Sequence, residues 1–131
     1  MTTVLATGVF DHFHPGHRFF LESAKKLGDR LVVIVARDEN VFRIKGFFPE
    51  YSEKERLQSI RNSGVADEVL LGKRGEDFLK IVSEIAPDLL AVGYDQHIPP
   101  HFSEYFPQIL FCTIPAKNPE KWKSSFYRKS T

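Results

Sequence analysis

Three histidines stand close together near the start of the chain, at His12, His14 and His17. Their segment, "GVFDHFHPGHRFF" (residues 8–20), also holds two glycines and a proline where a strand-like apolar run gives way to a helix-like run. Residues three apart on a helix lie on one side, with Cβ atoms about 5–6 Å apart, so His14 and His17 can flank one ligand. The free amides and dipole of a helix start attract phosphate. The segment therefore predicts a cradle for a phosphate chain.

Two glycines of this segment, Gly8 and Gly16, would let a ligand approach the backbone closely. Neither a G-x-G-x-x-G loop nor a G-x-x-x-x-G-K-[ST] loop follows the first apolar run, which disfavours hydride transfer and P-loop hydrolysis. Metal ligation by the histidines is also disfavoured, because no acidic or thiol ligand lies at zinc-site spacing. A purely structural explanation stays open, in which the histidines cap and pack a helix end.

The elements that position this segment alternate between strands and helices. We predict strands over residues 3–10, 30–38, 67–72, 88–95 and 108–115. We predict helices from Pro15 to about Gly28, from the Ser52–Glu55 capping box to about Asn62, along the apolar stripe at 78–85 and briefly at 99–106, with a loop over 38–51. This alternation indicates an α/β fold of three layers with a five-stranded parallel sheet, whose ligands bind beyond the carboxyl ends of the strands.

Composition limits the classes of protein to consider. A chain of 131 residues with 42% hydrophobic content is expected to form a single domain over residues 1–131. The net charge of +1 disfavours nucleic acid or an anionic membrane as partner. The lone Cys112 lies among apolar residues, which predicts an inert buried thiol and a reducing, cytoplasmic location. The longest uncharged apolar run, residues 31–36, is too short to span a bilayer, and the N-terminus lacks the basic start of a signal peptide.

The stretch "GVFDHFHPGH" (residues 8–17) resembles the [GT]-x-F-D-x-x-H-x-G-H signature of the cytidylyltransferase-like nucleotidyltransferases. The H-x-G-H core is short, but the preceding G-x-F-D and the following "LGDRLVV" strand make the resemblance specific. It implies a Rossmann-like nucleotidyltransferase fold. It also implies that His14 and His17 contact nucleotide phosphates and stabilise the transition state, with further nucleotide contacts from Gly8, Val9, Phe10 and Gly16. Class I aminoacyl-tRNA synthetases share H-x-G-H, yet this chain is too short for their other modules.

The resemblance extends over nearly the whole chain. "FRIKG" places Arg43 and Lys45 where such enzymes carry a phosphate-binding lysine, which implies a catalytic Lys45 and an acceptor site of Asp11, Arg43 and Lys45. "EKERL" places Arg56 where they carry a helix arginine that contacts nucleotide. "APDLLAVGYDQ" resembles the region that lines the nucleotide base, and "WKSSFYRK" resembles the family's C-terminal [ST]-[ST]-rich motif at a helix start. This implies nucleotide contacts from Gly93, Tyr94, Asp95, Lys123, Ser124 and Ser125.

The sequence departs from the family pattern in two places. Val9 stands where the family carries Thr or Ser, and six residues follow Ser125, so a full closing helix after the serine motif is not expected. The basic tail 115–131 is expected to close over the triphosphate as a lid, with a frayed terminus as the alternative.

Several other residues keep an alternative role. Any one of Arg43, Lys45 and Arg56 can be a solvated surface charge. Asp11 can face a divalent cation, hold the histidines through hydrogen bonds or form a turn, and Asp95 can cap the turn that follows it. The aromatic residues of the 38–51 loop can stack on a flavin, although a core edge or a dimer contact is the commoner role for such rings: Phe42, Phe47, Phe48 and Tyr51.

The chemistry implied is transfer of a nucleotidyl group. Such transfer depends on positioning and on neutralising phosphate charge, and the sequence has no Ser-His-Asp or Cys-His arrangement for a covalent intermediate. "VIVARD", "LLAVGYDQ" and "KSS" are most similar to archaeal-type FAD synthetases, which implies AMP transfer from ATP to FMN with release of pyrophosphate. Mg²⁺ is expected, bound mainly by substrate phosphates and not by a side-chain metal site.

Two alternatives to FMN adenylylation remain. A glycerol-3-phosphate cytidylyltransferase that uses CTP is the alternative within the family. A nucleotide-binding module without turnover is the alternative from another class. Dimers are common in the family, so a homodimer is expected.

Overall fold

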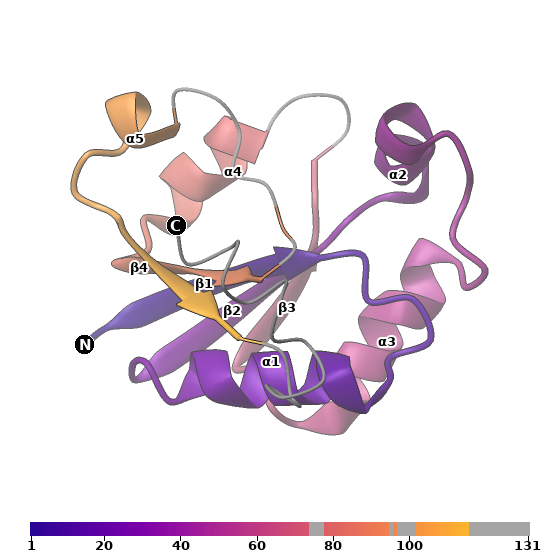
Figure 1. Cartoon of the computed structure of the whole chain (residues 1–131), viewed down its shortest axis with the longest axis horizontal. Helices are drawn as coiled ribbons and strands as arrows, with labels where there is room; N and C mark the ends of the chain where they lie inside the picture. Colours follow the sequence, from indigo (N-terminus) through magenta and orange to yellow (C-terminus); the bar gives the residue numbers. More distant parts are fainter. Residues whose placement is uncertain (74–77, 95, 97–101, 116–131) are drawn as a thin grey trace.

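The computed structural model describes residues 1–73, 78–94, 96 and 102–115 of the chain. Strands and helices alternate through this part, with two helices in succession between the second and third strands (Figure 1). The order is β1 (Thr3–Gly8), α1 (Pro15–Lys25), β2 (Arg30–Val35), α2 (Asp38–Lys45), α3 (Glu53–Ser63), β3 (Glu68–Leu71), α4 (Phe78–Ile85), β4 (Leu89–Gly93), α5 (Phe102–Tyr105) and β5 (Leu110–Ile114).

The sheet has five parallel strands in the order β3-β2-β1-β4-β5, which confirms the predicted five-stranded parallel sheet. β1 lies at its centre, where Gly8 pairs with Val35 of β2 and Ala6 pairs with Ala91 of β4. Because the strands are parallel, their carboxyl ends meet at one edge. The chain builds outward from β1 in both directions, so the switch point lies at that edge between β1 and β4.

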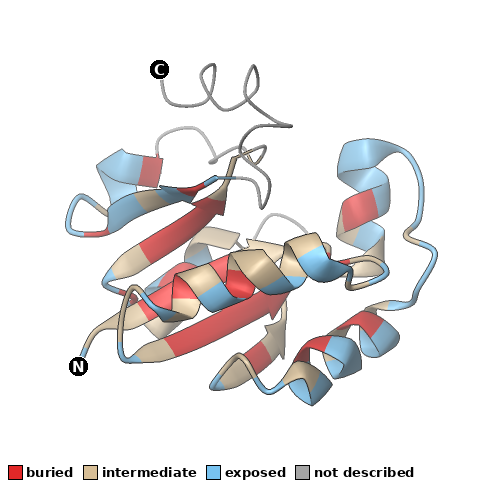
Figure 2. Cartoon of the chain, turned by 60° about the horizontal axis from the view of Figure 1, so that its bottom comes forward, coloured by how far each residue is buried: buried red, intermediate tan, exposed pale blue. Residues whose placement is uncertain are grey.

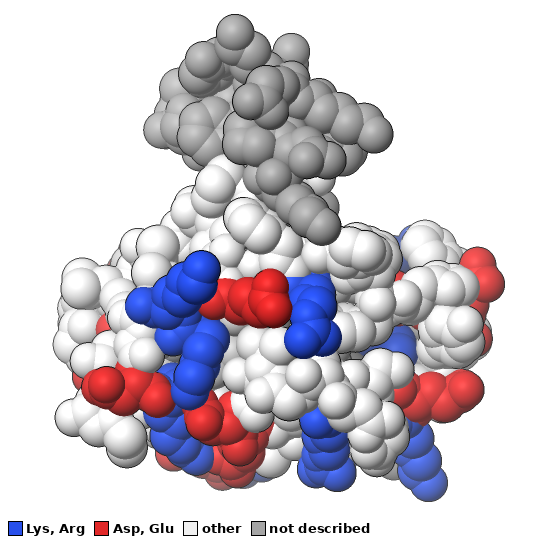
Figure 3. All heavy atoms as spheres, turned by 90° about the horizontal axis from the view of Figure 1, so that it is seen from below, with Lys and Arg blue, Asp and Glu red and all other residues white. Residues whose placement is uncertain are grey.

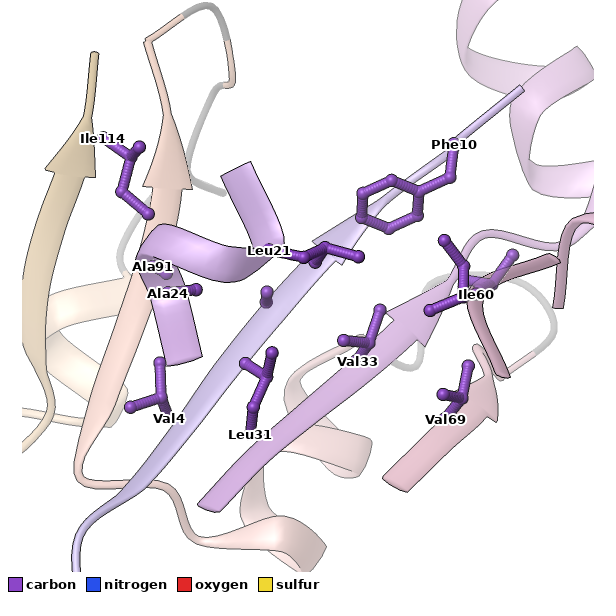
Figure 4. Packing of buried hydrophobic residues seen from close by; sticks show 12 residues of the cluster. Val4, Phe10, Leu21, Ala24, Leu31, Val33, Ile60, Val69, Ala91 and Ile114 are labelled. Atoms are coloured by element: carbon purple, nitrogen blue, oxygen red, sulfur yellow. The ribbon is translucent and has the colours of Figure 1, made fainter. Parts of the chain in front are cut away.

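Helices cover both faces of the sheet. α1 and α3 cover one face, and α4 and α5 cover the other (Figure 1). Successive residues of β1 enter opposite cores, with Val4 and Ala6 in the core under α1 and α3 and Leu5 in the core under α4. Buried residues fill the central strands and the inner side of α1 (Figure 2), and Figure 4 shows the α1 and α3 core at close range. The three-layer arrangement is therefore as predicted.

The loop predicted over residues 38–51 is wrong in its first half, because α2 occupies Asp38–Lys45. This helix lacks the usual sequence signals. Arg37 at its N-cap makes no side-chain capping bond, and Val41 is its buried residue, so no apolar stripe marks it. It carries acidic residues in its first turn and basic residues in its last, which suit the helix dipole. Contacts with α3, described below, fix its start.

Seen from below, over α1 and α3, basic and acidic side chains are interspersed (Figure 3).

Cys112 lies on β5, an edge strand of the described sheet, and is half-buried. The prediction of a buried thiol is therefore wrong, because, among the described strands, β5 is covered by a neighbour on the β4 side alone. In the described ranges, no helix is long and apolar enough to cross a membrane. That residues 1–131 form one folding unit stays a prediction.

Candidate active site

The start of α1 brings His14 and His17 together. His14 is the N-cap, and its Nδ1 accepts hydrogen bonds from the backbone N–H of Gly16 at 3.1 Å and of His17 at 3.4 Å. In return, His17 Nδ1 accepts the backbone N–H of His14 at 3.3 Å. This is a capping box built from two imidazoles. The two rings stack with centroids 3.6 Å apart and planes 20° apart.

The box fixes which nitrogen of each ring can donate. Because both Nδ1 atoms accept backbone hydrogen bonds, a neutral ring must carry its proton on Nε2. His14 is exposed and His17 is half-buried. The helix start therefore offers two N–H donors beside its own backbone amides, which is a suitable arrangement for phosphate oxygens. Contact with a nucleotide stays a prediction, but capping and donation are compatible roles for these residues.

The turn before α1 is folded back on itself. Phe10 and His12 lie in the left-handed region, with φ of 55° and 64°. Such values are strained for side chains of this size and persist only where the surroundings hold them. Phe10 is buried, its ring meets that of His17 edge-on at 5.5 Å, and a Cβ on Gly8 would lie 2.9 Å from it. Phe10 therefore supports His17 from inside, and the predicted nucleotide contact would have to come from its backbone.

Asp11 joins this turn to the connector before α3. Its Oδ2 accepts the backbone N–H of Glu50 at 2.9 Å, and its Oδ1 accepts that of Tyr51 at 3.0 Å. Partial burial raises the pKa of Asp11, but these two N–H groups, with the charges of His12 and Arg56, hold it below its ordinary value. Both carboxylate oxygens are thus engaged in bracing the loop, and the predicted acceptor contact would compete with that role.

Arg56 is buried, with 1% of its surface exposed. Its Nη1 donates to the Val9 carbonyl at 2.8 Å, its Nε donates to the Tyr51 carbonyl at 3.0 Å, and its Nη2 donates to Asp38 Oδ1 at 2.6 Å. The structure therefore does not bring Arg56 to the exposed side of the corner, and a direct phosphate contact would first require this buried side chain to become accessible. Arg56 is therefore a positioning residue: it joins the turn after β1 to the starts of α2 and α3.

The starts of α2 and α3 cap each other, which the sequence reasoning missed. Asp38 N–H donates to Glu53 Oε1 at 2.9 Å, and Glu53 N–H donates to Asp38 Oδ2 at 3.2 Å. Arg37 Nη1 also donates to Glu53 Oε2 at 3.1 Å. The available signal was an acidic residue in the first turn of each helix. Asp38 and Glu53 are fifteen residues apart, so no local spacing pattern predicts that they pair.

Gln96, which the sequence reasoning also missed, lies at the switch point between β1 and β4. Its Nε2 donates to the Thr7 carbonyl of β1 at 2.7 Å, and its Oε1 accepts the N–H of Gly93 at 2.7 Å. The amide thus ties the ends of the two central strands together, and the Gly93 N–H is already used. A polar residue just after a central strand was the available signal. Tyr94, next to Gly93, is half-buried.

The remaining predicted residues are spread over other segments. Arg43 and Lys45 are exposed on α2, which stands beyond the carboxyl edge of the sheet (Figure 1). Arg43 Nη2 donates to Asn40 Oδ1 at 3.4 Å. The other predicted contacts and nearly all of the basic tail lie outside the described residues: Asp95, Lys123, Ser124, Ser125 and the segment 116–131.

The described carboxylates of this corner do not fit a Mg²⁺ site built from side chains. Asp11, Asp38 and Glu53 already accept backbone N–H or guanidinium hydrogen bonds. Among the residues with described positions, no three His, Cys, Asp or Glu side chains gather as metal ligands would.

Comparison with known proteins gives a consistent picture. A family model described as cytidylyltransferase-like matches residues 5–128. The chain is 48% identical over 96 residues to the FAD synthase of Methanosarcina barkeri, covering 73% of this chain and 67% of that protein. It is 49% identical over 98 residues to the FAD synthase of Ferroglobus placidus, covering 74% and 62%. The chain thus matches about two thirds or somewhat less of these relatives' length.

Solved structures agree on the fold. The crystal structure of a Thermoplasma volcanium protein, described as a lipopolysaccharide core biosynthesis protein, superposes with a TM-score of 0.75 at 40% identity, covering 85% of this chain and 95% of that one. Pantoate-β-alanine ligase from Francisella tularensis superposes with a TM-score of 0.62 at 14% identity, a likeness of fold alone.

Proposed function

The chain belongs to the cytidylyltransferase-like family, and on that premise we propose that it transfers AMP from ATP to FMN, forming FAD and releasing pyrophosphate. The observation that carries the proposal is the imidazole capping box at the start of α1, which supplies two Nε2–H donors at the switch point of a parallel sheet. The choice of ATP and FMN is supported by the FAD synthase relatives at 48% and 49% identity.

In this reaction an oxygen of the FMN phosphate attacks the α-phosphorus of ATP. A new P–O bond forms, the bond to the bridging oxygen between the α- and β-phosphates breaks, and its electron pair leaves with pyrophosphate. The acceptor is already ionised, so no general base is required. Nε2–H of His14 and of His17 would donate to oxygens that gain charge as the bond breaks, and such preorganised donors act more strongly on the transition state than on the ground state.

Other groups of the chain hold this corner in place. Arg56, Asp11 and Gln96 fix the turn, the connector and the strand ends by the hydrogen bonds given above. Lys45, exposed at the end of α2, is proposed to neutralise phosphate charge. Mg²⁺ is proposed to arrive with the nucleotide, bound by its phosphates and shielding their charge.

The proposal is tested by measuring pyrophosphate release from the purified full chain with four substrate pairs: ATP or CTP, each with FMN or glycerol 3-phosphate. We expect release with ATP and FMN, together with FAD as a chromatographic product. His17→Asn, which lacks Nε2, is the matched control for contaminating activity. Release with CTP and glycerol 3-phosphate alone would replace the proposal by the alternative enzyme, and nucleotide binding without release from any pair would favour a module without turnover.

The expected homodimer, the cytoplasmic location and the absence of nucleic-acid or membrane partners stay predictions. Sedimentation of the full chain at several concentrations measures the first of them.

A further inference from the structure

Three phenylalanines at the end of α2 and just after it are exposed to solvent. Phe42, on α2, is 48% exposed, and Phe47 and Phe48, just after that helix, are each 60% exposed. The rings of Phe42 and Phe48 stack with centroids 4.6 Å apart and planes 22° apart. None of the three belongs to either hydrophobic core. We call these residues the aromatic platform.

The backbone holds the platform in shape. α2 ends at Gly46, which has φ of 84° and donates its N–H to the Phe42 carbonyl at 2.8 Å. This left-handed turn, which favours glycine, reverses the chain so that Phe48 returns onto Phe42. The two rings are thus already aligned, and a flat ligand that extended their stack would meet a surface whose ordering cost has been met during folding.

The platform is tied to the histidine corner. Glu50 and Tyr51, which follow the platform within three residues, donate their backbone N–H groups to Asp11, and the Tyr51 carbonyl accepts from Arg56. His12 Nε2 lies 3.3 Å from Glu50 Oε2, and its ring meets that of Tyr51 at 4.6 Å. The connector that carries the platform therefore has a fixed position relative to the turn that leads into His14.

Basic side chains accompany the rings. Lys45 is exposed three residues after Phe42, on the same side of α2, and Arg43 is exposed next to it in the sequence. Both lie in the last turn of the helix, where cations are favoured. Flat rings and nearby cations suit a ligand that combines a planar conjugated ring with a phosphate arm. They suit a dimer contact less well, because stable interfaces bury about 800 Å² per partner and their centres are poor in lysine.

Resting on the proposed function, we infer that the aromatic platform is the acceptor subsite and takes the flat ring system of a flavin phosphate, while the neighbouring cations face its phosphate arm. The flavin ring would extend the Phe42–Phe48 stack. A non-aromatic acceptor such as glycerol 3-phosphate has nothing to place there.

The experiment uses the full chain and two separate readouts, because binding and turnover can then fail independently. Flavin binding is followed by the quenching of FMN fluorescence without nucleotide, and FAD formation is followed at varied FMN and varied ATP. The variants are Phe42→Ala, Phe48→Ala, the double variant, and Phe48→Leu, which keeps apolar volume but removes the ring. Ile44→Ala on the same helix and Tyr105→Ala on α5 are matched controls at exposed positions.

We expect each single alanine variant to weaken FMN binding and raise the KM for FMN by about two- to tenfold, the factor that one aromatic stacking contact is worth. The double variant should lose more, Phe48→Leu should resemble Phe48→Ala, and kcat, the KM for ATP and the thermal midpoint should stay near wild type. Both controls should behave as wild type.

Three results would overturn the inference. Unchanged KM and Kd for FMN in the double variant would remove the platform from the acceptor site while leaving the proposed function in place. A shift of sedimentation from dimer to monomer in the double variant, with FMN affinity intact, would assign the platform to a second copy of the chain. Absence of FMN quenching by the wild type would also overturn it, whereas quenching without FAD formation would count against the proposed function alone.

Discussion

Two helices of this protein begin with the same device built from different residues. At the start of α3, Ser52 and Glu55 form a capping box, with Glu55 N–H donating to Ser52 Oγ at 3.2 Å and Ser52 N–H donating to Glu55 Oε1 at 3.1 Å. At the start of α1, His14 and His17 make the equivalent pair of hydrogen bonds through Nδ1. Both boxes satisfy the same two backbone N–H groups, those of the N-cap residue and of the residue three positions later.

The difference lies in the second polar atom that each imidazole carries. A hydroxyl or a carboxylate completes the cap at α3, and nothing more is needed there. An imidazole has a second nitrogen, so the cap at α1 both closes the helix and presents two Nε2–H donors. Residues that are more elaborate than their structural task requires are good candidates for chemistry, and this comparison supports the catalytic assignment independently of the family signature.

The largest expected effect comes from separating capping from donation. Asn in place of His14 or His17 supplies a side-chain oxygen near the position of Nδ1 but has no counterpart of Nε2. We expect kcat to fall by about 10²–10³ in each variant, the usual loss for one donor to a developing charge. Thermal unfolding should change little, which distinguishes these variants from His14→Ala. Full activity in both variants would reduce the α1 box to an ordinary cap.

A second prediction concerns the Arg56 guanidinium, which holds the starts of α2 and α3 against the turn after β1. Arg56→Met should destabilise the fold by about 3 kcal/mol, at the lower end for a broken buried pair because Asp38 is still partly exposed. Urea unfolding measures this loss. Pairing the change with Asp38→Asn should recover part of it, since the uncompensated carboxylate is then gone. A surface role for Arg56 would instead leave the unfolding midpoint unchanged.

A third prediction addresses the cap that has no chemical task. Ser52→Ala should cost about 1 kcal/mol of stability, the usual value for a lost N-cap. Its kcat should match the wild type when measured well below the thermal midpoint. A fall in kcat comparable to that of the histidine variants would show that the two boxes are not divided between structure and chemistry as we describe.

The smallest expected effect is a pH dependence of stability that comes from Asp11, which links the turn before α1 to the connector before α3. The folded pKa of Asp11 is lowered, so its contribution to stability is present above its unfolded pKa and is lost as pH falls through the folded value. In urea titrations from pH 6 to pH 2.5, the stability difference between wild type and Asp11→Asn should shrink below about pH 4. A constant difference across this range would mean that the Asp11 charge contributes nothing.

The sequence predicted the framework well because its signals are local. Apolar runs marked the strands, Ser52 and Glu55 marked the start of α3, and the H-x-G-H spacing placed two histidines on one helix start. The missed features depend on partners distant in the sequence. α2 is fixed by Asp38 and Glu53 capping each other, and Gln96 bonds to Thr7 across 89 positions, so no spacing rule reveals either. Arg56 was expected to contact nucleotide because "EKERL" matches the family's helix arginine, and its burial depends on packing that the sequence does not show.

The strand order has a consequence for how the protein is made. β1 leaves the ribosome before the other four strands of the sheet, yet it occupies the middle, and its neighbour β4 begins only at Leu89. Contacts between chain segments so far apart form slowly, because a long loop must close before they contribute. The turn that leads into His14 also waits for Arg56 to emerge before its Val9 carbonyl has a partner. The strand of this sheet that is made first, and the turn that follows it, are therefore among the last parts to acquire their working shape.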